Sequence, residues 1–195
     1  MQILQDNTWP TYLTSYHKDA FSMVSCHTSF YATLLFYSFS TPRYFHITPQ
    51  PLPRRERHDG INFVVNTPTH AKSAPLFFIS AKNNYWADSA ELRFRADQEI
   101  RKRLSKSLKD CPLPFLWGIS FLGSRMHVYC ADTATSTVNP PPEPPSGSST
   151  NLPPDFLAVE WDVDVLSEDG FKTMKEIMGS ISTQFESLRI EDCMQ

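Results

Sequence analysis

Three polar residues in two apolar runs are the first candidates for chemistry in this sequence. Asn62 lies in the run from Ile61 to Asn66, and Ser80 and Lys82 lie at the end of the run that begins at Leu76. The ammonium of Lys82 could contact a phosphate as a point charge. A strand-end lysine can equally place its charge in solvent while its stem lies along apolar surface. Lys82 is therefore either a site lysine or a solvated strand-end lysine.

The segment after these runs is rich in basic side chains and forms the strongest helix pattern of the chain. Between residues 93 and 109, seven Lys and Arg residues stand against Asp97 and Glu99. Such a helix can attract a phosphate backbone, although an ordinary solvated face has the same composition. Arg93 and Asp97 fall within its apolar arc, where we expect an inward pair. The candidates for nucleic-acid contact are Arg95, Arg101, Lys102 and Lys106.

This helix is predicted over residues 88–108. Asp88 followed by Glu91 resembles a capping box, and Glu99 precedes Arg103 by four residues, the spacing of a supportive ion pair. Apolar residues recur at every fourth position and predict a buried stripe. The stripe consists of Leu92, Ala96, Ile100, Leu104 and Leu108.

The remaining elements place this helix between strands. Residues 61–66 and 76–81 predict two strands separated by a turn region, and Phe115–Leu122 with Met126–Ala131 predicts a hairpin that turns at Gly123-Ser124. Residues 139–154 form a proline-rich loop, and a final helix begins after an N-cap at Ser167. The expected fold is α/β or α+β, with a mixed central sheet flanked by helices.

Size and composition exclude several classes of protein. With 195 residues, a net charge of -3 and 41% hydrophobic residues, the chain fits one core domain with an appended segment. We expect an N-terminal arm outside the core over residues 1–58, with a linker from residue 41, and a core over residues 59–190. Any nucleic-acid contact must use a local basic patch. The longest apolar window is too short for a membrane span, and the four scattered cysteines are typical of reduced thiols in an intracellular protein.

Residues 59–187 resemble a fungal, mostly uncharacterised family in the PD-(D/E)XK nuclease-like superfamily. The resemblance rests on the order and spacing of several short motifs. These are Asp59–Val65, Pro75–Lys82, Arg95–Arg101, Trp117–Gly123, Val128–Thr135 and Trp161–Leu166. It implies a restriction-endonuclease-like core, in which an Asp and a Glu hold Mg²⁺ and a lysine positions the reacting groups.

The resemblance also implies where the site residues lie. The first carboxylate position falls on Asn62, the second on Ser80 and the lysine on Lys82, so both carboxylates are replaced by neutral side chains. Relatives carry a Gln before an apolar-Arg pair in the helix, and this chain has Glu99 there. Asp59 is the nearest replacement for Asn62.

Three hypotheses follow for function. The first is a non-catalytic nuclease-like domain that binds a partner, either nucleic acid or protein, without a metal. The second is an active Mg²⁺-dependent nuclease that recruits Asp59, Asp97 or Glu99 as displaced carboxylates. The third is a protein-interaction module that uses the aromatic N-terminal arm and the proline-rich loop. The substitutions at positions 62 and 80 favour the first and weigh against an enzyme.

Overall fold

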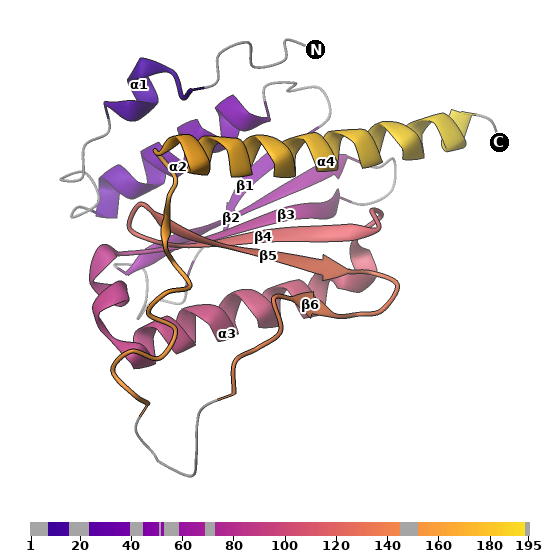
Figure 1. Cartoon of the computed structure of the whole chain (residues 1–195). Helices are drawn as coiled ribbons and strands as arrows, with labels where there is room; N and C mark the ends of the chain where they lie inside the picture. The colour runs from indigo at the N-terminus through magenta and orange to yellow at the C-terminus, as the bar shows by residue number, and fades with distance from the viewer. Residues whose placement is uncertain are drawn as a thin grey trace.

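A mixed, open seven-stranded sheet forms the centre of the molecule (Figure 1). The computed structural model describes residues 8–15, 24–39, 45–50, 52, 59–68, 73–144 and 152–193. The strands run in the order β1-β2-β3-β4-β5-β6, and β7 also pairs with β5. Their bounds are β1 His46–Gln50, β2 Gly60–Pro68, β3 Ser73–Lys82, β4 Phe115–Leu122, β5 Arg125–Asp132, β6 Val138–Asn139 and β7 Val163–Asp164.

Neighbouring strands are antiparallel except for β3 and β4, which are parallel. A parallel pair needs a long crossover connection, and helix α3 (Ala90–Ser107) supplies it. The two strands predicted on either side of residues 67–74 are direct neighbours. The expected α+β class with a mixed sheet is therefore confirmed.

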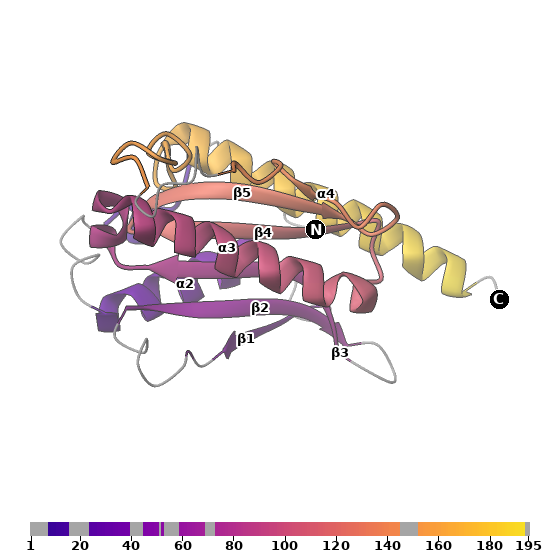
Figure 2. The same cartoon turned by 90° about the horizontal axis from the view of Figure 1, so that it is seen from below.

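Helix α3 covers one face of the sheet (Figure 2). Ala96, Ile100 and Leu104 of the predicted stripe are fully buried. The N-cap, however, is Ser89, whose side chain accepts from the backbone N–H of Leu92. Asp88 instead ends a short 3₁₀ helix, η2 (Asn84–Asp88), so the predicted cap was one residue early. A second 3₁₀ turn, η3 (Leu108–Asp110), follows α3.

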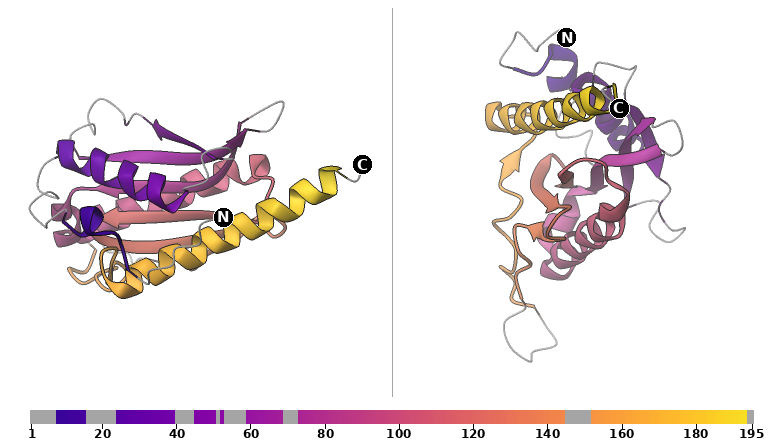
Figure 3. Two further views of the ribbon diagram at one scale, coloured as in Figure 1. Left: turned by 90° about the horizontal axis from the view of Figure 1, so that it is seen from above. Right: turned by 90° about the vertical axis from the view of Figure 1, so that its right-hand side faces the viewer.

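The opposite face carries the larger core, under helices α2 (Val24–Ser38) and α4 (Glu168–Cys193) (Figure 3). Ser167 caps α4 as predicted, since its hydroxyl accepts from the N–H of Gly170 at 3.0 Å. Phe171, Met174, Ile177 and Ile181 of the predicted stripe are buried. Among the described residues, no helix combines the length and the apolarity that a membrane crossing would need.

The described parts of residues 1–58 belong to the core, so the expectation of an arm outside it was wrong. Leu13 of helix α1 (Thr11–Thr14), together with Tyr31 and Leu34 of α2, packs in the same cluster as the sheet. The indole N–H of Trp9 donates to the carbonyl of Val165 at 2.6 Å. Tyr31 donates its hydroxyl proton to the carbonyl of Gly123, at the turn between β4 and β5.

The expected linker over residues 41–58 contains a strand. β1 pairs along its whole length with β2 and forms an edge of the sheet. Further across the sheet, β4 and β5 form the predicted hairpin and are joined at Gly123, whose φ is 61°. This left-handed conformation favours glycine. Arg54, Arg55 and Arg57 of this segment lie outside the described residues.

Candidate functional site

A row of five polar residues crosses the sheet at one level. Gln50 of β1 is opposite Asn62, which is opposite Ser80, which pairs with Ser120, which is opposite His127 of β5. Residues that are direct partners on neighbouring strands share one face of a sheet. We call these five residues the polar row. Sequence reasoning found Asn62 and Ser80, and the strand register adds the other three.

The polar row faces α3. Val64, Phe78 and Tyr129 lie two residues from the row on their strands, and they pack in one cluster with Ile100 and Leu104 of the helix. Side chains two apart on a strand point to the same face. The helix therefore covers both the polar row and the apolar residues that lie two positions along the strands from it.

Two atoms of the polar row are buried without a hydrogen-bond partner in the described part of the protein. Asn62 is 4% exposed and Ser120 is fully buried. The carbonyl oxygen of the Asn62 side chain and the hydroxyl of Ser120 have no partner. An unsatisfied buried polar group typically costs about 1–3 kcal/mol. The row therefore costs stability, which is typical of residues retained for a reason other than packing.

Ser120→Ala is expected to raise the free energy of unfolding by about 1 kcal/mol, because it removes a buried hydroxyl that has no partner. Urea unfolding followed by circular dichroism would measure the change. Ser124→Ala is the matched control, since the Ser124 hydroxyl donates to the Asp164 carboxylate at 3.2 Å and its loss should lower stability. Equal destabilisation by both substitutions would show that the Ser120 hydroxyl is satisfied.

Lys82 lies at the end of β3, two residues beyond Ser80, and is fully buried. Its Nζ is 2.6 Å from the carboxylate of Glu99 on α3 and lies 4.5 Å from the centre of the Trp86 ring. The other oxygen of Glu99 is 3.0 Å from Nε of Arg95. A buried ammonium requires such a counter-charge, so the alternative of a solvated strand-end lysine is wrong.

The pairing of Glu99 differs from the one that the helix spacing predicted. Glu99 contacts Lys82 and Arg95, while the guanidinium of Arg103 lies 5.7 Å from the centre of the Phe78 ring. Burial lowers the pKa of Arg103, although the nearby charge of Glu99 opposes this effect. The buried lysine therefore takes the carboxylate that local spacing assigned to Arg103.

Asp59, the proposed replacement for Asn62, is directed elsewhere. Its carboxylate accepts a hydrogen bond from the Tyr85 hydroxyl at 2.6 Å, at an exposed position. Burial and this hydrogen bond both raise the pKa of Tyr85. The backbone carbonyl of Asp59 accepts from the N–H of Asn83, just beyond β3. Its side chain, however, bonds to η2.

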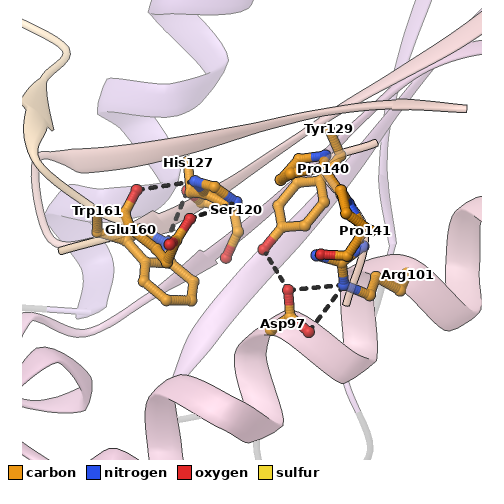
Figure 4. A network of polar contacts seen from close by, with 9 residues as sticks. All are labelled: Asp97, Arg101, Ser120, His127, Tyr129, Pro140, Pro141, Glu160 and Trp161. Carbon is orange, nitrogen blue, oxygen red and sulfur yellow. Dashed lines mark hydrogen bonds and ion pairs between the residues drawn. The ribbon is translucent and has the colours of Figure 1, made fainter. Parts of the chain in front are cut away.

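A second polar cluster joins α3 to β5 and to the proline-rich loop (Figure 4). Both carboxylate oxygens of Asp97 are 2.8 Å from Nε of Arg101, and one accepts from the Tyr129 hydroxyl at 3.0 Å. Burial, and then the charge of Asp97, raise the pKa of Tyr129 well above its ordinary value. Arg101 also donates to the carbonyl of Pro140 at 2.5 Å. Its guanidinium is therefore committed to contacts within the chain.

The expected pair between Arg93 and Asp97 is not formed, although both side chains point inward. Arg93 donates to three backbone carbonyls, at distances of 2.5–2.9 Å. These belong to Ala87, Pro154 and Phe156. Asp97 takes Arg101 as its cation instead. Of the four expected nucleic-acid contacts, Arg95, Lys102 and Lys106 are exposed.

His127 ends the polar row and contacts the segment that follows the proline-rich loop. Its Nδ1 is 2.8 Å from the carbonyl oxygen of Glu160, and its Nε2 is 3.4 Å from the Glu160 carboxylate. The indole N–H of Trp161 donates to the carbonyl of Ser120 at 3.1 Å. Burial lowers the pKa of His127, although the nearby charge of Glu160 opposes this effect.

The thiols of Cys111 and Cys130 show no feature of a reactive site. Cys111 and Cys130 are both free. Burial raises the pKa of Cys111 to about 11 and also raises that of Cys130. A thiol with a raised pKa has little of the nucleophilic thiolate at neutral pH.

The residues present do not fit the magnesium site that the resemblance implies. Mg²⁺ prefers carboxylate oxygens, and the two implied positions hold an amide and a hydroxyl. The three alternative carboxylates, those of Asp59, Asp97 and Glu99, bond to different partners. Within the described residues, no group of three His, Cys, Asp or Glu side chains could hold a metal ion. No family model, curated protein or solved structure matches the chain.

Proposed function

We propose that the chain is a non-catalytic, restriction-endonuclease-like domain that binds nucleic acid. The observation that carries this proposal is the chemistry around Lys82. Asn62 and Ser80 are direct partners on β2 and β3, and Lys82 follows two residues later on the same face with its ammonium against Glu99. This arrangement supports a nuclease-like scaffold that lacks the carboxylates for metal-assisted cleavage and whose site lysine is paired within the chain.

The outer face of α3 is the surface that we propose for the nucleic acid. Three exposed cations of α3 and one of the following turn η3 form a group that we call the basic stripe. They are Arg95, Lys102, Lys106 and Lys109. Because the whole chain carries a net charge of -3, binding must rest on this local stripe and should be weakened by salt. Arg95 contributes less than the lysines, since it shares Glu99 with Lys82.

Binding should be measured by fluorescence anisotropy with labelled duplex and single-stranded DNA across a salt series. The double substitution Lys102→Gln and Lys106→Gln is expected to weaken duplex binding about tenfold and to reduce the salt slope by about 1.8, the value for two phosphate contacts. The matched control is Lys172→Gln with Lys175→Gln on α4, which covers the opposite face of the sheet. It removes the same charge and should leave binding unchanged.

The same samples test the absence of catalysis. We expect no cleavage with Mg²⁺ or Mn²⁺. Metal-dependent cleavage that Lys82→Ala abolishes would overturn the proposal in favour of an active nuclease with displaced carboxylates. If the chain did not bind DNA, or bound it with an affinity that salt does not change, the proposal that it binds nucleic acid would be overturned and a protein partner favoured.

A further inference from the structure

The described beginning of the proline-rich loop is an exposed run with little conformational freedom. It consists of Pro140, Pro141, Pro142, Glu143 and Pro144, and all but Pro140 are exposed. Proline fixes φ near -65°, and a residue that precedes a proline is restricted to extended or polyproline-II backbone. We call residues 140–144 the proline run.

Helix α3 holds the start of the proline run in place. Arg101 donates to the carbonyls of Pro140 and Pro141, at 2.5 and 3.4 Å. The guanidinium is itself fixed by Asp97 and lies 5.0 Å from the centre of the Tyr129 ring (Figure 4). The support for the run is therefore a buried ion pair on a helix, since the side chains of Asp97 and Arg101 are only 5% and 11% exposed.

The same helix also holds the chain where it returns to the body. Arg93, which is buried, donates to the carbonyls of Pro154 and Phe156 at 2.6 and 2.9 Å. Two arginines of α3, eight residues apart in the sequence, thus fasten both sides of the proline-rich loop. Buried Arg93 and largely buried Arg101 therefore attach the loop to the helix on both sides.

We propose that the proline run is a docking ligand for a protein domain that recognises polyproline II through an aromatic groove. Such domains bind a preformed extended helix with little ordering cost. The carbonyls that Arg101 leaves available are those of Pro142, Glu143 and Pro144. Glu143 is the single charged residue of the stretch 133–144, so the groove that fits carries basic residues at its rim.

The attachment to α3 gives this ligand an advantage over a free peptide. A segment already held in its bound conformation loses less conformational entropy on binding. Arg101→Lys keeps the charge but loses the planar fork that reaches Asp97 and two carbonyls together. It is therefore expected to weaken docking without altering the run itself.

The test uses recombinant SH3, WW and EVH1 domains, each titrated with the full chain by isothermal calorimetry. At least one of them, with basic residues beside its groove, is expected to bind. Pro142→Ala with Pro144→Ala should weaken that binding at least tenfold, and Arg101→Lys about threefold. A peptide of residues 138–144 should bind about tenfold more weakly than the full chain. Pro154→Ala is the matched control, because Pro154 is also exposed and its carbonyl is also held by an arginine.

Absence of binding to all three domains would overturn the proposal. It would also be overturned if the double proline substitution had no more effect than Pro154→Ala. Neither result bears on the proposed nucleic-acid function, because the substitutions that test DNA binding lie on the basic stripe and those that test docking lie outside it.

Discussion

Ile100→Asp is expected to unfold the protein, at a cost of about 5 kcal/mol or more. Ile100 of α3 is fully buried and packs with Leu104 of the same helix and with Phe78 of the sheet. The new carboxylate would be desolvated at a position with apolar neighbours, and that cost is comparable to the whole stability of a typical domain. Thermal unfolding followed by circular dichroism would show the loss of the cooperative transition.

Two controls separate charge from position in this experiment. Ile100→Val removes one methylene from the same site and should cost about 1 kcal/mol. Gln98→Asp places the same carboxylate on the exposed side of α3 and should change stability by no more than about 0.5 kcal/mol. A near-native melting temperature for Ile100→Asp would show that the buried stripe is wrongly assigned.

Glu99→Ala is expected to lower the free energy of unfolding by about 3 kcal/mol. It removes the carboxylate that lies 2.6 Å from the fully buried ammonium of Lys82. Breaking a buried ion pair on one side is far more costly than replacing both partners by apolar groups. The partial exposure of Glu99, at 31%, places the expected value at the lower end of the range for buried pairs.

The double variant Lys82→Met with Glu99→Ala provides the control. It should be more stable than Glu99→Ala alone, since no buried charge is left beside the apolar replacement. Urea unfolding of the two single variants, the double variant and the original chain gives the coupling energy directly. Additive effects of the two substitutions would show that the pair does not interact in solution.

Elements with a clear local period were predicted well from the sequence. The stripe of α3 repeats every four residues, and β2 to β5 are short apolar runs bounded by turn-forming or polar residues, so each element could be identified from its own residues. The opposition of Asn62 and Ser80 followed from pairing two adjacent runs, and the structure confirms it.

Elements without a local period were missed. Helix α2 mixes aromatic and small polar residues around its circumference, so the polarity of its side chains does not mark a buried side. β1 contains Pro49 and follows Pro42, which made it resemble a linker. Ser89 and Asp88 are both good N-cap residues. The choice between them depends on where η2 ends, and the spacing of residues within α3 does not predict that position.

The polar contacts of the site were the least predictable part. Ser120 and His127 join Asn62 only through the register of strands that lie far apart in the sequence. Glu99 has an arginine four residues later, and local spacing therefore favoured that partner over Lys82 on a neighbouring strand. Burial decided the outcome, because the fully buried ammonium of Lys82 needs a carboxylate more than the partly buried guanidinium of Arg103 does.

The bond between Trp9 and Val165 joins residues 156 positions apart, and this distance has a consequence for synthesis. During translation, the first helices leave the ribosome long before the segment that completes their packing. Their aromatic side chains remain exposed until helix α4 has been synthesised and can pack against them. A nascent chain in this state exposes apolar surface and is prone to aggregation until that packing forms.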